Sequence, residues 1–283
     1  MANHMKLENA ERYYLDLIFP VFLIMSAELL IFFGHSEAAM YIHALNLIFL
    51  SLSSIFIRNR TYPALMLLPL FRLLNVAMPV FFHLTLHSYV MVYAPMFIPI
   101  YLILKERFIT REEAGLTFER FWYYLPLSVS LGLVLGWGEY LVLKPQMLTV
   151  ENDLQDILIL VLTMIIFVGV VEEFVFRSAL QTVLQERIGL VSGLLLTSLI
   201  FGFMHSGYRL PLELFYVTIA GLAFGILFWF SKSLPIIALA HGITNISLFL
   251  IAPLKQEMLP YLIIGPLFLF LFYAYALKRL GHV

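Results

Sequence analysis

Two adjacent glutamates, Glu172 and Glu173, lie inside one of the most apolar stretches of the chain, and Arg177 follows four residues later. A charged side chain in hydrocarbon costs at least about 2.5–3.5 kcal/mol on insertion scales, so these residues need partners or a functional role. Two histidines further along, His205 and His241, also stand within apolar runs. Carboxylates and imidazoles can act as general acids and bases, so this combination favours a hydrolytic site inside a bilayer.

The spacing of these residues indicates which of them share a helix face. Glu173 and Arg177 stand at positions i and i+4, which permits an ion pair within one helix. Glu172 then points about 100° away from Glu173 and is available to a substrate or to water. His241 and Asn245 have the same spacing, and an imidazole and an amide on one face can donate hydrogen bonds to an oxyanion. Taken alone, the charged residues also fit a buried cluster that holds helices together, or the proton site of a transporter.

The composition indicates a membrane protein. The chain is 62% hydrophobic and 12% charged, whereas soluble domains carry about 25% charged residues. Apolar runs recur along its whole length, each long enough to cross a hydrocarbon core about 30 Å thick. Continuous runs predict helices rather than a barrel, whose strands would alternate. Ten spans are predicted, at residues 15–33, 38–57, 62–84, 88–104, 121–143, 157–184, 189–206, 211–230, 235–252 and 259–277.

The positions of Lys and Arg predict the orientation of these spans. Most of them fall on one side of the membrane when the amino terminus is placed in the cytoplasm. We therefore expect a multi-pass protein of a prokaryotic cytoplasmic membrane with both termini cytoplasmic. The longest segment between spans, residues 105–120, is charged and is predicted to form a short interfacial helix. The basic residues form no patch, so nucleic acid is not an expected partner.

Other features of the apolar stretches are interpreted as structural. Arg72 is expected to pair with Asp16 or Glu28, and Glu139 is likewise assigned to structural pairing rather than to substrate binding. Small residues near the motifs predict that helix backbones approach closely, as in Gly189-x-x-x-Gly193 and Gly221-x-x-x-Gly225. The absence of cysteine excludes disulfides, a thiol nucleophile and a Cys-ligated metal.

The depths of the candidate residues differ. Counted from the cytoplasmic ends of the predicted spans, Glu172 lies about 20 Å deep and His241 only about 10 Å deep. A shared site therefore requires that the sixth span is tilted, or that it breaks near Gly169.

Three motifs follow one another in the order EExxxR, FxxxH and HxxxN, at Glu172–Arg177, Phe201–His205 and His241–Asn245. In residue type and order they resemble the CAAX protease and bacteriocin-processing (CPBP, or Abi) family, which includes the type II CAAX prenyl endopeptidases. The similarity extends over about residues 112–250. It implies an all-α polytopic membrane protein in which a four-helix catalytic core lies within residues 105–252. Residues 1–104 then form N-terminal transmembrane helices without a recognised motif, and 253–283 a C-terminal helix with a short tail.

The resemblance also implies roles for single residues. Glu172 would be the general base that activates water, with His205 beside it. His241 and Asn245 would stabilise the tetrahedral oxyanion. The supporting members of the motifs are Glu173, Arg177 and Phe201.

The need for a metal is left open by the resemblance, because these proteins carry both metalloprotease and glutamic-protease labels. If zinc is bound, Glu172, His205 and His241 are the expected ligands. Asn245 is a poor zinc ligand and a good oxyanion donor, so we favour a mechanism that requires no cofactor.

The predicted activity is hydrolysis of a peptide bond in a membrane-associated or lipidated protein or in a leader peptide. The predicted partners are this substrate and the lipid bilayer. Two alternatives are a proton-coupled transporter and a non-catalytic membrane scaffold built on the same core. Transporters often show paired repeats with broken helices, and we find no such pairing. A scaffold would show eroded motifs, whereas every motif residue is present.

Overall fold

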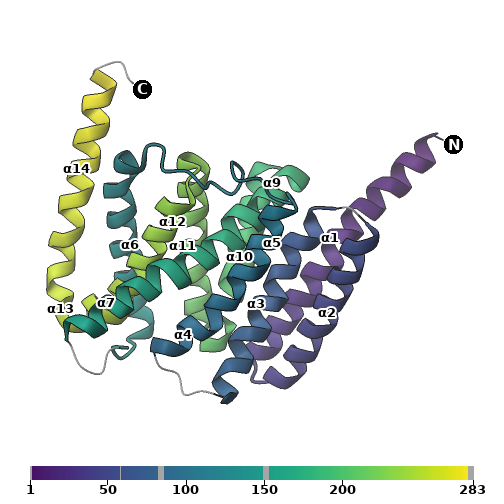
Figure 1. The fold of residues 1–283 in the computed structure, drawn as a ribbon, viewed down its shortest axis with the longest axis horizontal. Helices are drawn as coiled ribbons and strands as arrows, with labels where there is room; N and C mark the ends of the chain where they lie inside the picture. Colours follow the sequence, from purple (N-terminus) through teal and green to yellow (C-terminus); the bar gives the residue numbers. More distant parts are fainter. Residues whose placement is uncertain (1, 58, 82–85, 149–152, 280–283) are drawn as a thin grey trace.

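The computed structural model describes residues 2–57, 59–81, 86–148 and 153–279. Within these ranges the chain forms helices and turns and no strand, so the predicted all-α class is confirmed. Figure 1 shows a bundle in which the start of α1 (Ala2–Phe32) and the end of α14 (Leu259–Arg279) lie on the same side. Which side faces the cytoplasm stays a prediction.

Between α1 and α14 the helices follow one another along the chain and can be taken in three consecutive groups. The first comprises α2 (Ser36–Phe56), α3 (Thr61–Phe81), α4 (Leu86–Tyr93), η1 (Ala94–Met96) and α5 (Phe97–Lys105). The second comprises α6 (Phe121–Leu143) and one long helix built from α7 (Leu154–Leu162), η2 (Thr163–Gly169), α8 (Val170–Glu173), η3 (Phe174–Gln181) and α9 (Thr182–Ile188). The third comprises α10 (Leu190–Phe203), η4 (Ser206–Tyr208), α11 (Pro211–Ser231), α12 (Leu234–Ile246), η5 (Ser247–Ile251), α13 (Ala252–Lys255) and η6 (Gln256–Met258).

Seven helices among the described residues are long and apolar enough to cross a membrane. They are Ser36–Phe56, Ser88–Lys105, Phe121–Leu143, Leu154–Ile188, Leu190–Tyr208, Pro211–Ser231 and Leu234–Lys255. The other three predicted spans coincide with α1, α3 and α14, although the last residues of span 62–84 lie outside the described residues. A polytopic membrane protein is thus confirmed, while the count of ten stays a prediction.

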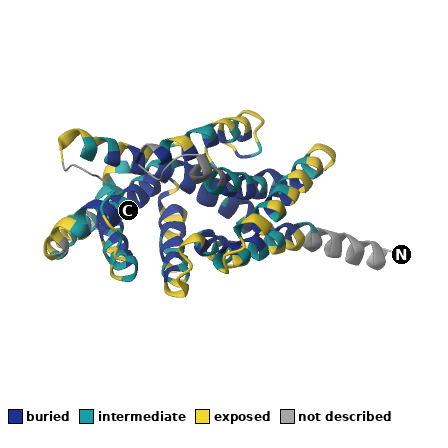
Figure 2. Ribbon diagram, turned by 90° about the horizontal axis from the view of Figure 1, so that it is seen from below, coloured by how far each residue is buried: buried dark blue, intermediate teal, exposed yellow. Residues whose placement is uncertain are grey.

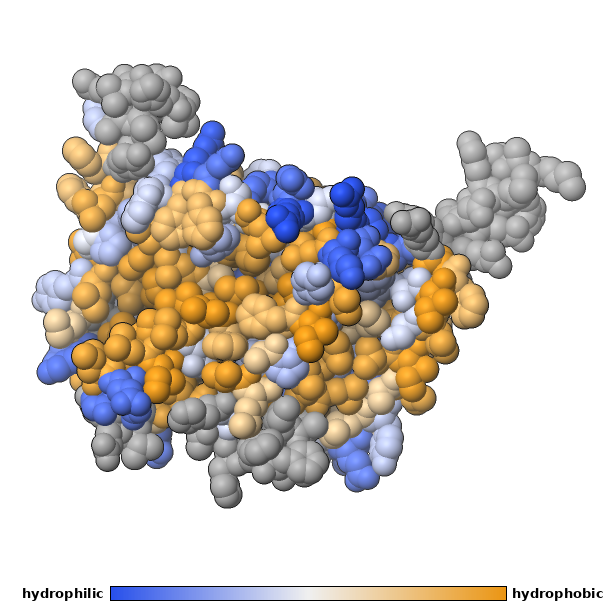
Figure 3. Space-filling view, viewed as in Figure 1, coloured by the Kyte–Doolittle hydropathy of each residue, from blue (hydrophilic) through white to orange (hydrophobic). Residues whose placement is uncertain are grey.

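The surface agrees with this assignment. A broad hydrophobic zone covers the middle of the molecule in Figure 3, and the hydrophilic residues gather toward its two ends. Figure 2 shows that buried residues occupy the faces that the helices turn toward one another, while exposed residues lie outside. Many of the exposed side chains are large and apolar, as expected for helices that face lipid.

The interfacial helix predicted at residues 105–120 is wrong, because the described chain makes only turns from 106 to 120. Gly115 takes a positive φ of 68°, and a Cβ there would lie 2.8 Å from the carbonyl oxygen of Lys232. Its own carbonyl accepts a hydrogen bond from the backbone of Leu234 at 2.8 Å. The loop is therefore joined to the start of α12 at Gly115, while its other backbone bonds close local turns, such as Leu116 N–H to the Arg111 carbonyl at 3.0 Å.

An ion pair also joins this loop to Arg60, the residue directly before α3. A guanidinium nitrogen of Arg60 lies 2.8 Å from a carboxylate oxygen of Glu113. Partial burial would raise the pKa of Glu113, but the backbone N–H of Thr110 and the Arg60 guanidinium outweigh it and hold the pKa below its ordinary value.

The long helix crosses the bundle obliquely. In Figure 1 it runs from the α7 label to the α9 label at a slant to α6 and α14. Asp153 caps its start by accepting a hydrogen bond from the backbone of Asp156 at 2.8 Å, and Gly189, with a φ of 92°, follows its end. The chain stays helical throughout, with π-helical turns at 163–169 and 174–181 on either side of α8. Of the two arrangements expected to bring Glu172 near His241, the structure has the tilted helix and no break near Gly169.

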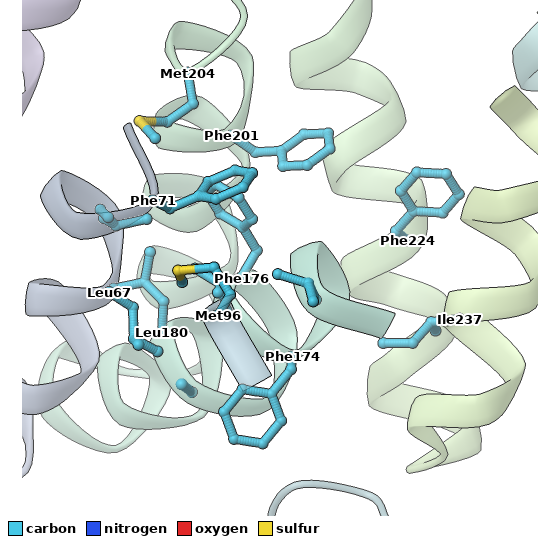
Figure 4. Packing of buried hydrophobic residues seen from close by; sticks show 14 of the residues in the cluster. Leu67, Phe71, Met96, Phe174, Phe176, Leu180, Phe201, Met204, Phe224 and Ile237 are labelled. Atoms are coloured by element: carbon cyan, nitrogen blue, oxygen red, sulfur yellow. The ribbon is translucent and has the colours of Figure 1, made fainter. Parts of the chain in front are cut away.

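Small residues let the long helix and α12 come together. A Cβ at Gly169 would collide with the carbonyl oxygen of Ala238, and one at Gly242 would lie 2.7 Å from the Cα of Ile165. Large aromatic residues then fill the space beside this contact. Figure 4 shows Phe174, Phe176, Phe201 and Phe224 as parts of one buried apolar cluster.

Candidate active site

The two adjacent glutamates of α8 face different surroundings, as their spacing predicts. Glu172 lines a cavity of about 350 Å³. The carboxylate of Glu173 instead turns into the protein, where Oε2 lies 3.3 Å from Nε of Arg177. Both of these paired side chains are fully buried, so the predicted i, i+4 ion pair is confirmed.

Arg177 is held on several sides. A terminal nitrogen donates to the carbonyl oxygen of Gly221 at 3.1 Å. The guanidinium carbon lies 4.4 Å from the ring centroid of Phe201 and 5.6 Å from that of Phe224. Cation–π contacts of this kind gain strength when they are shielded from water. The charge of Arg177 therefore fixes Glu173 and also binds α10 and α11 to the long helix.

His241 on α12 lies between the two glutamates. Its Nδ1 is 2.6 Å from Oε1 of Glu173, and its Nε2 is 3.8 Å from Oε2 of Glu172. Because Glu173 also faces a guanidinium, it is an acceptor, and the hydrogen of this bond belongs to Nδ1. The ring is stacked on Phe224 with centroids 5.2 Å apart and an interplanar angle of 12°. The orientation of the imidazole is thus fixed, with Nε2 on the side of Glu172.

His205 lies just beyond the end of α10, directly before η4. Its Nδ1 donates to the carbonyl oxygen of Phe201 at 2.9 Å, which leaves Nε2 free of this contact. His205 lines the same cavity as Glu172. Phe201 thus supports two residues, because its carbonyl orients His205 while its ring lies edge-on to His241 at 5.9 Å. The spacing of the FxxxH motif has a direct structural reason here.

Asn245, one turn after His241 on α12, is only partly buried. No hydrogen bond of its side chain is present within the described structure, and it is not among the residues that line the cavity. The structure brings Glu172, Glu173, Arg177, Phe201, His205 and His241 into one region. The oxyanion role of Asn245 stays a prediction.

The N-terminal helices complete the cavity, although no motif was recognised in them. Its lining comes from α3, α4, η3 and the α10–η4 corner as well as from Glu172. The hydroxyl of Tyr93, at the end of α4, donates to Oε1 of Glu172 at 2.5 Å. The sequence offered no signal for this residue, since it is one of 15 tyrosines in an apolar chain.

A buried ion pair holds the segment that carries His205. The Nε and Nη2 atoms of Arg72 bond the two carboxylate oxygens of Glu28 at 2.7 and 2.6 Å, which confirms the predicted pairing of Arg72. Arg72 also donates to the carbonyl of Met204, and the hydroxyl of Ser206 donates to Glu28 at 2.6 Å. Both neighbours of His205 in the chain are therefore attached to this pair, which we call the Glu28–Arg72 clamp.

Glu139 is buried on α6, and Glu213 is buried in the first turn of α11. The two carboxyl groups interact with each other. The structural role expected for Glu139 therefore involves a second acidic residue, and the described part of the chain gives it no Lys or Arg partner.

The residues do not fit a zinc site. Within the described ranges, no three His, Asp or Glu side chains are grouped so that they could hold a metal ion. Zinc needs ligand atoms about 2.0–2.2 Å from one centre. The Nδ1 atoms of His205 and His241 are engaged in hydrogen bonds, so only their Nε2 atoms could bind a metal, and with Glu172 they form no group that could hold one. The alternative ligand set of Glu172, His205 and His241 is not arranged for coordination.

A comparison with protein families finds one match. Residues 154–247 match the model described as type II CAAX prenyl endopeptidase Rce1-like. The matched segment contains the three motifs that carry the candidate site, so the predicted resemblance is confirmed. No curated protein and no solved structure matches the chain significantly.

Proposed function

We propose that the chain, whose residues 154–247 are similar to type II CAAX prenyl endopeptidases, hydrolyses a peptide bond of a membrane-associated substrate within the bilayer. The observation that carries this proposal is the place of Glu172. Its carboxylate lines a cavity that also contains His205, and it lies 3.8 Å from the fixed ring of His241. The proposed base and the imidazole of His205 thus line one cavity, and the imidazole of His241 lies beside the base although it is not among the lining residues.

In the proposed reaction, Glu172 accepts a proton from a water molecule as the water oxygen attacks the substrate carbonyl. His205 assists in orienting this water. Because its Nδ1–H is used by Phe201, the Nε2 of the neutral ring is an acceptor directed to the cavity. Glu172 then gives the proton to the departing amine, and the peptide bond breaks.

His241 stabilises the tetrahedral intermediate in this proposal. A contact of 3.8 Å is too long for a direct hydrogen bond, so Nε2 is not consumed by Glu172. To donate to an oxyanion, the ring must carry hydrogens on both nitrogens when the intermediate forms. Asn245, whose amide has no competing partner within the described structure, is the proposed second donor. Its partial exposure leaves it accessible to a bound peptide.

The size and lining of the cavity support a class of substrate. The cavity of about 350 Å³ has room for part of a peptide rather than for a folded protein. Aromatic residues such as Tyr89 and Phe71 form much of its wall. A short extended segment of a membrane-associated or lipidated protein, or of a leader peptide, fits both the volume of the cavity and its aromatic wall.

The test compares Glu172→Gln with wild-type protein in liposomes. The amide cannot accept a proton, so cleavage of a reporter peptide should stop while the protein remains folded. Glu112→Gln, in the exposed loop before α6, is the matched control and should keep full activity. Membrane proteins that accumulate uncleaved in cells carrying Glu172→Gln would reveal the natural substrate. Turnover by Glu172→Gln would remove this residue as the base, and the absence of any cleavage by wild type would favour the scaffold alternative.

A further inference from the structure

A tyrosine outside the matched segment makes direct contact with the candidate base. Tyr93 is the last residue of α4 and is 5% exposed. Its hydroxyl donates to Oε1 of Glu172 at 2.5 Å, across 79 positions of sequence. A short bond from a neutral donor to a carboxylate is among the stronger hydrogen bonds in proteins.

The phenol ring is itself held in place. It lies edge-on to Phe71 of α3 at a centroid distance of 5.2 Å. It is stacked beside Tyr89, one turn earlier on α4, at 6.3 Å and an interplanar angle of 17°. A tyrosine locked between two aromatic rings presents its hydroxyl at a fixed point, which lets it orient a flexible glutamate.

The two oxygens of Glu172 therefore have separate surroundings. Oε1 is occupied by Tyr93, whereas Oε2 faces Nε2 of His241 at 3.8 Å. Without the phenol, the terminal torsion of a glutamate is broad and roughly two-fold, so either oxygen could turn toward the histidine. The Tyr93 contact removes this freedom.

We propose that Tyr93 is a positioning residue for Glu172: its hydroxyl fixes Oε1 and thereby directs Oε2 toward the reacting water. This inference rests on the proposed function, because it assigns Tyr93 through the role of Glu172 as base. It also gives the N-terminal helices a part in catalysis that the three motifs do not contain.

Kinetics provide the first test. Tyr93→Phe keeps the ring and deletes only the hydroxyl, so kcat should fall about ten- to hundredfold, the loss expected for one hydrogen bond to a charged group, while KM changes little. Tyr216→Phe is the matched control, because it deletes a hydroxyl bonded to the carbonyl of Leu135 at 2.6 Å and should leave both parameters unchanged. Equal kcat in Tyr93→Phe and wild type would overturn the proposal.

A second test does not depend on peptidase activity. Dicyclohexylcarbodiimide modifies protonated carboxyl groups in apolar surroundings, and mass spectrometry can follow the rate at each residue. In Tyr93→Phe the phenol hydroxyl no longer occupies Oε1, so Glu172 should be labelled several-fold faster, with unchanged labelling at Glu213 as the internal reference. If Glu172 labels at the wild-type rate, Tyr93 does not act through it, whatever happens to kcat. If the labelling changes but wild-type protein cleaves no peptide, the coupling of the two residues stands and the proposed function fails.

Discussion

The Nδ1 of His241 donates a hydrogen bond to the carboxylate of Glu173 at 2.6 Å, although 68 positions separate the two residues. The same carboxylate pairs with Arg177, so Glu173 lies between an imidazole of α12 and a guanidinium of the long helix and links the two helices. Carboxylates that orient an imidazole in this way fix which nitrogen faces the reacting centre. Glu173 thus orients the ring of His241, while Glu172 lines the cavity.

The oxyanion assignment predicts a kinetic signature for His241. His241→Ala should reduce kcat by about 10²–10³ and change KM much less, because an oxyanion donor acts mainly in the transition state. Asn245→Ala should show the same pattern if its amide joins the site when substrate binds. Steady-state assays with a reporter peptide measure both parameters. His35→Ala, at an exposed position before α2, is the control that should not alter them. A loss confined to KM would assign these residues to substrate binding.

Metal content provides a second prediction. The donor atoms of Glu172, His205 and His241 are not arranged around one centre. We therefore expect fully active protein to contain no stoichiometric zinc and to retain its activity in chelators. Elemental analysis of the purified protein, with activity measured before and after dialysis against a chelator, checks this. About one equivalent of zinc that disappears in the His205 or His241 variants, with activity restored by added zinc, would require a metal-dependent mechanism.

The Glu28–Arg72 clamp should stabilise both the fold and the site. Arg72→Met leaves Glu28 buried without its cation, and breaking a buried pair costs about 3–5 kcal/mol. The double variant Glu28→Gln/Arg72→Met removes the unpaired charge and should recover part of this loss. Thermal unfolding in detergent measures the difference, with the exposed Arg111→Met as control. If Arg72→Met alone unfolds like wild type, the ion pair contributes little.

A gentler change separates stability from positioning at this clamp. Ser206→Ala deletes only the bond from its hydroxyl to Glu28. Because Ser206 follows His205 directly, we expect Ser206→Ala to lower kcat clearly while the unfolding temperature stays close to that of wild type.

Close packing of the long helix against α12 predicts an effect at Gly169. A new Cβ in Gly169→Ala would collide with the backbone oxygen of Ala238, and overpacking of this kind typically costs about 1–3 kcal/mol. The shift should also separate Glu172 from His241 and lower kcat. Gly265→Ala on α14 is the matched control, because nothing lies within 4 Å of its added methyl group. It should be neutral or stabilising, by up to about 1 kcal/mol. A neutral Gly169→Ala would show that α12 can move without cost.

Features that repeat within one helix could be predicted from the sequence. The apolar runs predicted the helices, and the i, i+4 rule predicted the contact of Glu173 with Arg177. The ordered motifs predicted which spans carry the candidate site. The cost of a lone charge in an apolar environment predicted that Arg72 pairs with an acid of the first span, Asp16 or Glu28, and the structure selects Glu28.

Contacts between distant helices could not be predicted in this way. Tyr93 reaches Glu172 through the packing of α4 against the long helix, and no periodicity in a chain rich in aromatic residues singles it out. The charge of residues 106–120 suggested a surface helix, whereas the segment folds into turns that bond within themselves and, at Gly115, to Leu234 of α12. In both cases tertiary contacts decide the outcome.

The long oblique helix has a consequence for the lipid around it. Its 35 residues span about 50 Å at 1.5 Å per residue, well beyond the roughly 30 Å of a typical hydrocarbon core. Such hydrophobic mismatch is relieved by tilting or by local thickening of the bilayer. The same helix carries Glu172, whereas His241 stands on α12, which has a shorter apolar span. We therefore expect the acyl-chain length of the host membrane to act on the angle between these two helices, so that activity in reconstituted bilayers depends on their thickness.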